Sequence, residues 1–301
     1  MEPAISIVMC CYNSSEHIKK SIDSILCQSF KDFEFIIWDD GSKDDTKEIV
    51  QSYSDERIRY YYHENTGLGQ ALRFACEKAN ASIIARMDSD DIAIPNRLEL
   101  EYNYLITHPD TVLVSSAVNY IDDSDRLLGY SFPYTKSSIV HKIMKTGGSV
   151  IVHPASMFRK SAYDKAGGYL PLKKAQDSLL FSKMMKYGKL VVLPDILLNY
   201  RISLNSISSQ TSSSSYDSII VALRKKMIYD ETVSLDDIRV YNEIVLLAKK
   251  QLLEYKKENN SNRMKMSTDM KAFSFLSKFL GTNIARNLLI NSKNLTAMFL
   301  K

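Results

Sequence analysis

Short apolar runs alternate with amphipathic helical patterns through the first 121 residues of the chain. Residues 4–11, AISIVMCC, form a continuous apolar run, which is typical of a strand buried on both faces. The next segment places Ile18, Ile22 and Ile25 on one helical stripe, with Ser14 or Ser15 as the N-cap. The same reading predicts strands at 33–38, 58–64, 82–87 and 111–121, and helices at 46–54, 65–80 and 95–109. Strand–helix alternation of this kind predicts an α/β fold whose parallel sheet has helices on both faces.

The pattern becomes mixed after residue 130 and changes again near residue 203. Strands are predicted at 155–160 and 189–201, and a helix at 175–188. Residues 203–218 are rich in serine, which is typical of a linker or irregular segment, and helical patterns follow it. We therefore expect an α/β domain over residues 1–209 and a helical region over residues 210–301.

Acidic side chains follow two of the predicted strands. Asp39 and Asp40 end the second strand, and Asp88, Asp90 and Asp91 follow the fourth. Ligands of parallel sheets bind at the carboxyl ends of the strands, so both acidic clusters should lie at one edge of the sheet. A D-x-D spacing on extended backbone points two carboxylates to one side, and such oxygen ligands suit Mg²⁺ or Mn²⁺. The alternative for the second cluster is an ordinary acidic helix start.

The overall composition narrows the class of protein. Lys and Arg number 39 against 35 Asp and Glu, an excess of four that is too small to indicate nucleic-acid binding. The sequence has no P-loop, no zinc-ligand spacing and no G-x-S-x-G elbow, and the glycines at 67 and 69 do not make a dinucleotide-binding motif.

The N-terminus, the hydropathy and the cysteines all predict a cytoplasmic protein. The N-terminus lacks the basic region of a signal peptide, and no window reaches the roughly 18 uninterrupted apolar residues of a membrane span. The four cysteines, Cys10, Cys11, Cys27 and Cys76, form no C-x-x-C pair and are expected to be reduced.

A set of motifs in one order gives a specific resemblance. The chain resembles the family 2 glycosyltransferases in these stretches: SIVMCCYNSSEHIKKSIDSILCQSF, FEFIIWDDGSKDDT, ENTGLGQAL, ARMDSDDIAIPNRL, HPASMFRKSAYDKAGGY, QDSLLFSKMMKYG and LPDILLNYR. The resemblance covers roughly residues 4–208, about two thirds of the chain. The resemblance implies the GT-A fold, a Rossmann-like and mostly parallel sheet, and a reaction that inverts the anomeric centre.

The resemblance also implies a nucleotide-sugar site made of Cys10, Tyr12, Asp40, Arg86 and Asp88. In this reading Asp40 accepts a hydrogen bond from the base, Tyr12 packs against the base beside Cys10, and Asp88 contacts the ribose or a metal-bound water. For Arg86, an approach to the diphosphate and an ion pair with Asp40 or Asp88 are both open.

The same resemblance implies the metal ligands and the base. Asp90, with Asp88, would hold Mn²⁺ or Mg²⁺, while Asp91 would support the site and Arg97 would orient Asp91. Asp177 would be the general base that takes the proton of the acceptor hydroxyl, and its alternative is a solvent-facing helix carboxylate.

Two positions depart from the family pattern. Gln176 precedes Asp177 where the family often has Glu, and Ser203 stands where the family often has a histidine that completes the metal shell. A serine hydroxyl is a poor metal ligand. We therefore expect metal binding to depend on Asp90, the diphosphate and water.

The function that follows is metal-dependent, inverting transfer of a hexose. The expected donor is a UDP-sugar, and the expected acceptor is a saccharide or an undecaprenyl-linked saccharide in O-antigen, capsule or other surface polysaccharide synthesis. The alternatives are an inactive nucleotide-sugar-binding module and a nucleotidyltransferase or phosphatase.

The last 32 residues suggest a membrane contact. Residues 270–301 have no acidic side chain, and basic residues alternate with Phe and Leu along them. This composition predicts peripheral contact with anionic lipid on the inner face of the cell membrane. A helix that packs on the first domain or on a second subunit is the alternative.

Overall fold

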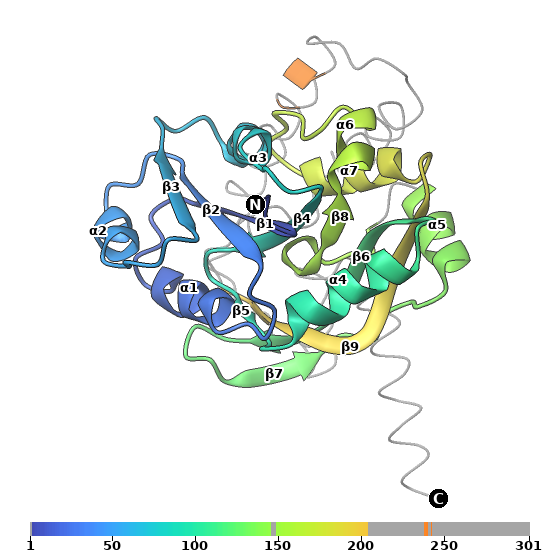
Figure 1. Ribbon diagram of the computed structural model, residues 1–301, viewed down its shortest axis with the longest axis horizontal. Helices are drawn as coiled ribbons and strands as arrows, with labels where there is room; N and C mark the ends of the chain where they lie inside the picture. Colours follow the sequence, from blue (N-terminus) through green and yellow to red (C-terminus); the bar gives the residue numbers. More distant parts are fainter. Residues whose placement is uncertain (1, 146–148, 204–237, 240–241, 243–301) are drawn as a thin grey trace, which may run out of the picture. The chain divides into compact units, whose positions relative to one another are not determined.

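The computed structural model describes residues 2–145, 149–203, 238–239 and 242 (Figure 1). Apart from Ile202 and Ser203, these residues belong to one compact unit. The helical region predicted for residues 210–301 lies outside the described residues, except for 238, 239 and 242.

Four parallel strands form the N-terminal half of the sheet. In spatial order they are β3 (Ile58–Tyr62), β2 (Phe33–Asp39), β1 (Ile5–Cys11) and β4 (Ile83–Asp88). In β1, Cys10 lies opposite Trp38 of β2 and Asp88 of β4. The four strands predicted from the first apolar runs are therefore confirmed, and their carboxyl ends are in register.

The second half of the sheet is mixed in direction. Within the described residues, β4 is followed by β8 (Met157–Arg159), β6 (Thr111–Ile121), β9 (Lys189–Arg201) and β5 (Ile92–Ala93), and β7 (Leu127–Tyr130) pairs with the end of β6. β8 runs antiparallel to both β4 and β6, whereas β6 and β9 are parallel. The fully parallel sheet implied by strand–helix alternation is thus interrupted by β8. An apolar buried strand has the same composition in either direction, so its sequence does not reveal its orientation.

Helices cover both faces of the sheet, as predicted (Figure 1). The helices on one face are α1 (Ile18–Leu26), α2 (Thr46–Gln51) and α4 (Arg97–Thr107), and those on the other are α3 (Leu68–Glu77), α5 (Ser137–Lys145), α6 (Lys160–Lys165) and α7 (Gln176–Met184). The side chains of alternate residues in β1 pack into the two hydrophobic cores on opposite faces of the sheet. Ile7 and Met9 pack with the first group, and Val8 and Cys10 with the second.

α3 approaches the chain before α7 without a side chain between them. A Cβ added at Gly69 would lie 2.5 Å from the carbonyl oxygen of Leu170 and 3.1 Å from the amide of Leu172. Only glycine allows this approach, and the segment that it supports leads directly to α7.

The four cysteines are free thiols, in agreement with the expectation. Cys10, Cys11 and Cys76 are buried, whereas Cys27 is exposed at the end of α1. Burial raises the pKa of the Cys76 thiol to about 12. No helix within the described ranges has the length and apolar character needed to cross a membrane.

Candidate active site

The carboxyl ends of β2, β1 and β4 bring the two acidic clusters to one edge of the sheet. Cys11 lies opposite Asp39, and Cys10 lies opposite Asp88. The sequence-based expectation that both clusters share an edge is confirmed, because β1 is the common neighbour of the two strands that carry them.

Hydrogen bonds join the loops that follow these three strands. The Asn13 amide donates to Ser42 Oγ at 2.9 Å, which ties the β1 loop to the β2 loop. The hydroxyls of Ser14 and Ser89 lie 2.9 Å apart, which ties the β1 loop to the acidic loop after β4. The edge is therefore one connected surface instead of three separate loops.

Asp40 fixes the start of α3. Its Oδ1 accepts hydrogen bonds from the Thr66 amide (2.9 Å) and the Thr66 hydroxyl (3.0 Å), and its Oδ2 accepts one from the Gly67 amide (2.8 Å). A carboxylate has about four lone-pair sites, so these three donors leave room for one more on Oδ2. Tyr12, at the end of β1, is half-exposed at the same edge, while Cys10 is buried beneath it.

Asp88, Asp90 and Asp91 form a cluster whose carboxylates can each offer an oxygen within 4.8 Å of the others. Burial and the neighbouring Asp88 raise the pKa of Asp90 to about 6. Burial, Asp90 and Asp88 likewise raise the pKa of Asp91, and its Oδ2 is buried without a hydrogen-bond partner. Three crowded carboxylates with an unpartnered oxygen are a donor set that fits a hard divalent cation, because such a cation relieves their repulsion.

Arg86 forms an ion pair with Asp88 and is almost fully buried. Its second guanidinium nitrogen donates to the Val8 carbonyl at 3.2 Å. Of the alternatives for Arg86, the ion pair with Asp88 is therefore present, and it places a positive charge directly beneath the edge.

Arg97 does not orient Asp91, which corrects one expectation. Arg97 donates to Glu101, four residues along α4, at 3.1 Å and to the Arg86 carbonyl at 2.8 Å. Asp91 Oδ1 instead accepts the backbone amide of Arg201, the last residue of β9, at 2.8 Å. No local pattern could reveal this bond, because its two residues are 110 positions apart.

Asp177 lies in the first turn of α7, which begins after Ala175 in the left-handed conformation (φ 58°). Burial raises the pKa of the Tyr169 hydroxyl, and the charges of Arg86 and Asp177 act on it with opposite signs. Tyr169 is hydrogen-bonded to His153 Nε2 at 2.7 Å, and burial together with Arg86 lowers the pKa of His153. Arg86 and the candidate base therefore both act electrostatically on Tyr169, and His153 is its hydrogen-bond partner.

Comparison with known proteins identifies the family. The profile of Glycosyl transferase family 2 matches residues 6–167. The chain belongs to this family. It is 32% identical over 220 residues to the O-antigen biosynthesis glycosyltransferase WbnJ of Escherichia coli, which covers 70% of this chain and 84% of WbnJ. It is also 30% identical over 178 residues to the putative glycosyltransferase EpsE of Bacillus subtilis, covering 58% of this chain and 63% of EpsE.

Solved structures show the fold of this glycosyltransferase. The crystal structure of S. aureus TarS 1–349 in complex with UDP-GlcNAc matches with a TM-score of 0.61 at 18% identity, covering 93% of this chain and 82% of that chain. The mannosyltransferase PcManGT from Pyrobaculum calidifontis, in complex with GDP-Man and Mn²⁺, matches with a TM-score of 0.58 at 15% identity, covering 98% and 88%. The fold is therefore the GT-A type, as the sequence motifs implied.

Proposed function

We propose that this glycosyltransferase transfers a hexose from a UDP-sugar to a saccharide or undecaprenyl-linked acceptor, with inversion, in the synthesis of a surface polysaccharide or O-antigen. The observation that carries the proposal is the acidic cluster at the edge of the sheet, in which Asp88 is paired with Arg86. Arg86 and Asp177 both act electrostatically on Tyr169, which supports a position of Asp177 near this edge. The similarity to WbnJ, which is named for O-antigen biosynthesis, supports the acceptor class. The complex of TarS with UDP-GlcNAc supports the donor class.

The donor nucleotide would bind over the ends of β1, β2 and β4. The lone pair left on Asp40 Oδ2 would accept the N–H of a base such as uracil, and the exposed ring of Tyr12 would stack on that base. Asp88 would contact the ribose, with Arg86 holding its carboxylate in place.

Asp90 and Asp88 would hold a Mn²⁺ or Mg²⁺ ion, and Asp91 would support them. The ion, when bound, neutralises the negative charge that gathers on the departing nucleoside diphosphate. The complex of PcManGT with Mn²⁺ supports this assignment. Ser203 stands where the family often has histidine and would be a poor ligand, so binding would depend on Asp90, the diphosphate and water.

Asp177 would remove the proton from the acceptor hydroxyl on the face opposite the leaving group. A single base that activates one displacement inverts the anomeric centre, so an α-linked donor should give a β-linked product. General-base assistance of this kind contributes about 10²–10⁴-fold in rate.

The test is Asp177→Asn, which keeps the shape of the side chain but cannot accept the proton. We expect turnover to fall by at least about 10²-fold, while calorimetry shows unchanged binding of the UDP-sugar and Mn²⁺. Asp164→Asn, at an exposed carboxylate of α6, is the matched control and should keep full turnover. Mutant turnover within tenfold of the original protein would contradict the base assignment.

A donor screen by calorimetry separates the remaining functions. UDP-sugars with Mn²⁺ should bind more tightly than GDP- or dTDP-sugars, and transfer should require an acceptor. Donor binding without turnover on any acceptor would favour the inactive binding module, and hydrolysis of the donor without acceptor would favour a phosphatase.

A further inference from the structure

Arg201 is the last residue of β9, and its side chain is fully buried. All of its bonds end on other segments of the chain. The acceptors are Asp91 Oδ1 for the backbone amide (2.8 Å), the Asp90 carbonyl for Nε (2.8 Å), and the Asp122 carbonyl (2.5 Å) and Asp125 Oδ1 (2.6 Å) for the terminal nitrogens.

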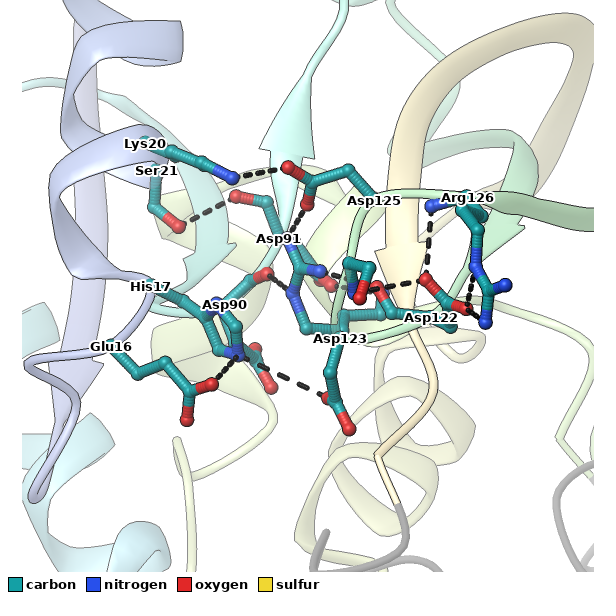
Figure 2. A network of polar contacts seen from close by, with 12 residues as sticks. Glu16, His17, Lys20, Ser21, Asp90, Asp91, Asp122, Asp123, Asp125 and Arg126 are labelled. Carbon is teal, nitrogen blue, oxygen red and sulfur yellow. Dashed lines mark hydrogen bonds and ion pairs between the residues drawn. The ribbon is translucent and has the colours of Figure 1, made fainter.

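Through these bonds Arg201 joins the acidic loop, which contains Asp90 and Asp91, to the turn between β6 and β7, which contains Asp122 and Asp125 (Figure 2). Asp125 has a positive φ of 63° in that turn, and its second oxygen forms an ion pair with Lys20 of α1. The neighbouring Ser21 donates from its hydroxyl to the Asp91 carbonyl at 2.6 Å. The acidic loop is therefore held from β9 by Arg201 and from α1 by Ser21.

The hydrogen bonds of the Arg201 guanidinium do not use the carboxylate oxygens of Asp88, Asp90 or Asp91. The guanidinium donates to the carbonyl oxygens of Asp90 and Asp122 and to the carboxylate of Asp125. Asp125 pairs with Arg201 through Oδ1 and with Lys20 through Oδ2. The loop is thus fixed by a cation that does not occupy the carboxylate oxygens that a divalent ion would need.

We propose that Arg201, together with Asp125, is a positioning residue that sets the geometry of the acidic cluster for the divalent cation and the donor diphosphate. This inference rests on the metal site of the proposed function. Residues that hydrogen-bond to metal ligands orient those ligands, and removing such a residue typically lowers the metal affinity by about 10–100-fold. Arg201 has this position because its side chain holds the backbone at Asp90, while its backbone amide holds the side chain of Asp91.

The first variant is Arg201→Lys. It keeps the positive charge but replaces a guanidinium that donates through three nitrogen atoms by a single ammonium group. The measurement is the affinity for Mn²⁺ in the presence of UDP, from the electron paramagnetic resonance signal of free Mn²⁺. We expect affinity to fall about 10–100-fold and the donor KM to rise, while kcat at saturating Mn²⁺ stays within about threefold. A residue needed only for folding would lower the folded fraction, and hence kcat, without changing the Mn²⁺ affinity of the folded protein.

The second variant is Asp125→Asn, which removes the charge that both Arg201 and Lys20 use. It tests the proposal even if Arg201→Lys does not fold, and we expect its Mn²⁺ affinity to fall at least about threefold. The matched control is Arg126→Ala, which removes an exposed cation of the same turn that pairs with the carboxylate of Asp122. Its affinity should stay within twofold of the original protein.

The outcomes distinguish a failure of the positioning role of Arg201 from a failure of the metal site itself. Unchanged Mn²⁺ affinity in folded Arg201→Lys or in Asp125→Asn would overturn the positioning role while leaving the metal site intact. If Asp90→Ala also binds Mn²⁺ as tightly as the original protein, or if the original protein binds none, the metal assignment fails and the positioning role fails with it.

Discussion

At the residue scale, Asp88, Asp90 and Asp91 are almost adjacent in the sequence, yet each carboxylate has a different environment. Asp88 is paired with Arg86, and Asp91 accepts the amide of Arg201. Asp90 has its pKa raised to about 6 by burial and by Asp88. The different partners therefore decide which carboxylate is held in place by the protein and which is available to a cation.

Asp44 is a second carboxylate whose partners define its role. Its oxygens accept hydrogen bonds from the Ser15 amide (3.0 Å) and from the Thr46 amide (3.1 Å), so it ties the β1 loop to the β2 loop. Burial by itself would raise the pKa of Asp44, but the hydrogen bonds from Thr46 and Ser15 outweigh it and lower the pKa to about 2.

Asp44→Ala should therefore destabilise the protein in a pH-dependent way. The pKa falls on folding from 3.8 to about 2, so the ionised form contributes stability above pH 3.8 that is lost as the pH falls through about 2. Allowing for solvent screening, we expect a loss of about 1 kcal/mol in the free energy of unfolding at pH 7. Urea denaturation at pH 7, 4 and 3 measures it, and the difference between variant and original should shrink toward low pH.

The control is Asp32→Ala, at an exposed position before β2, which should have the same urea midpoint as the original protein. A constant deficit for Asp44→Ala from pH 7 to pH 3 would mean that the ionised carboxylate is not what holds the two loops together.

The residues of the site were predictable to different degrees. The acidic clusters could be placed together because the ends of neighbouring parallel strands meet at one edge. Arg201 could not be predicted, because its acceptors lie near residues 90 and 122 and only the folded sheet brings them together. Arg97 was assigned to Asp91, whereas it pairs with Glu101 one helical turn away.

At the element scale, α3 supports the segment that leads to the candidate base. The close approach of Gly69 to Leu170 and Leu172 leaves no room for a side chain. Since Asp177 follows within a few residues, the packing of α3 helps to set where α7 begins.

Gly69→Ala should push this segment away from α3. The added methyl group meets a backbone carbonyl at 2.5 Å, which cannot move aside as a flexible side chain would. We expect a loss of about 1–3 kcal/mol in the free energy of unfolding, measured by denaturant titration, and a lower kcat in the folded protein.

Arg73→Ala, at an exposed position of the same helix, is the matched control and should change neither quantity. If Gly69→Ala kept both full stability and full kcat, the contact would not position α7.

The long strands followed the hydrophobic pattern. The predicted strand at 189–201 is β9 with the same bounds, and the apolar run at 4–11 contains β1. The strands that were not predicted, β5 and β7, have two and four residues and carry too little periodicity. The direction of β8 was not predictable, because it depends on where the chain re-enters the sheet.

At the scale of the whole molecule, the net charge of +4 is modest, but the C-terminal stretch is basic throughout. Residues 270–301 contain Lys271, Lys278, Arg286, Lys293 and Lys301 and no acid. This stretch lies outside the described residues, and its peripheral contact with anionic lipid stays a prediction.

Liposome co-sedimentation tests that prediction. The full chain should pellet with vesicles rich in anionic lipid at low salt and should be released at high salt, because charges near the surface are screened. A chain that ends at residue 269 should stay in the supernatant. Equal pelleting of both chains would indicate that the stretch packs against protein and does not anchor to lipid.

The distribution of the four thiols has a practical consequence for chemical labelling. Cys10, Cys11 and Cys76 are enclosed by the core, while Cys27 is open to reagents at the end of α1. The native protein should therefore react rapidly with one equivalent of an aromatic disulfide reagent, followed by absorbance, and with three more after addition of urea. Cys27→Ser should remove the rapid phase. A fluorophore attached at Cys27 would sit on the helix that provides Lys20 and Ser21 to the acidic loop, so its emission could follow Mn²⁺ titrations without any turnover.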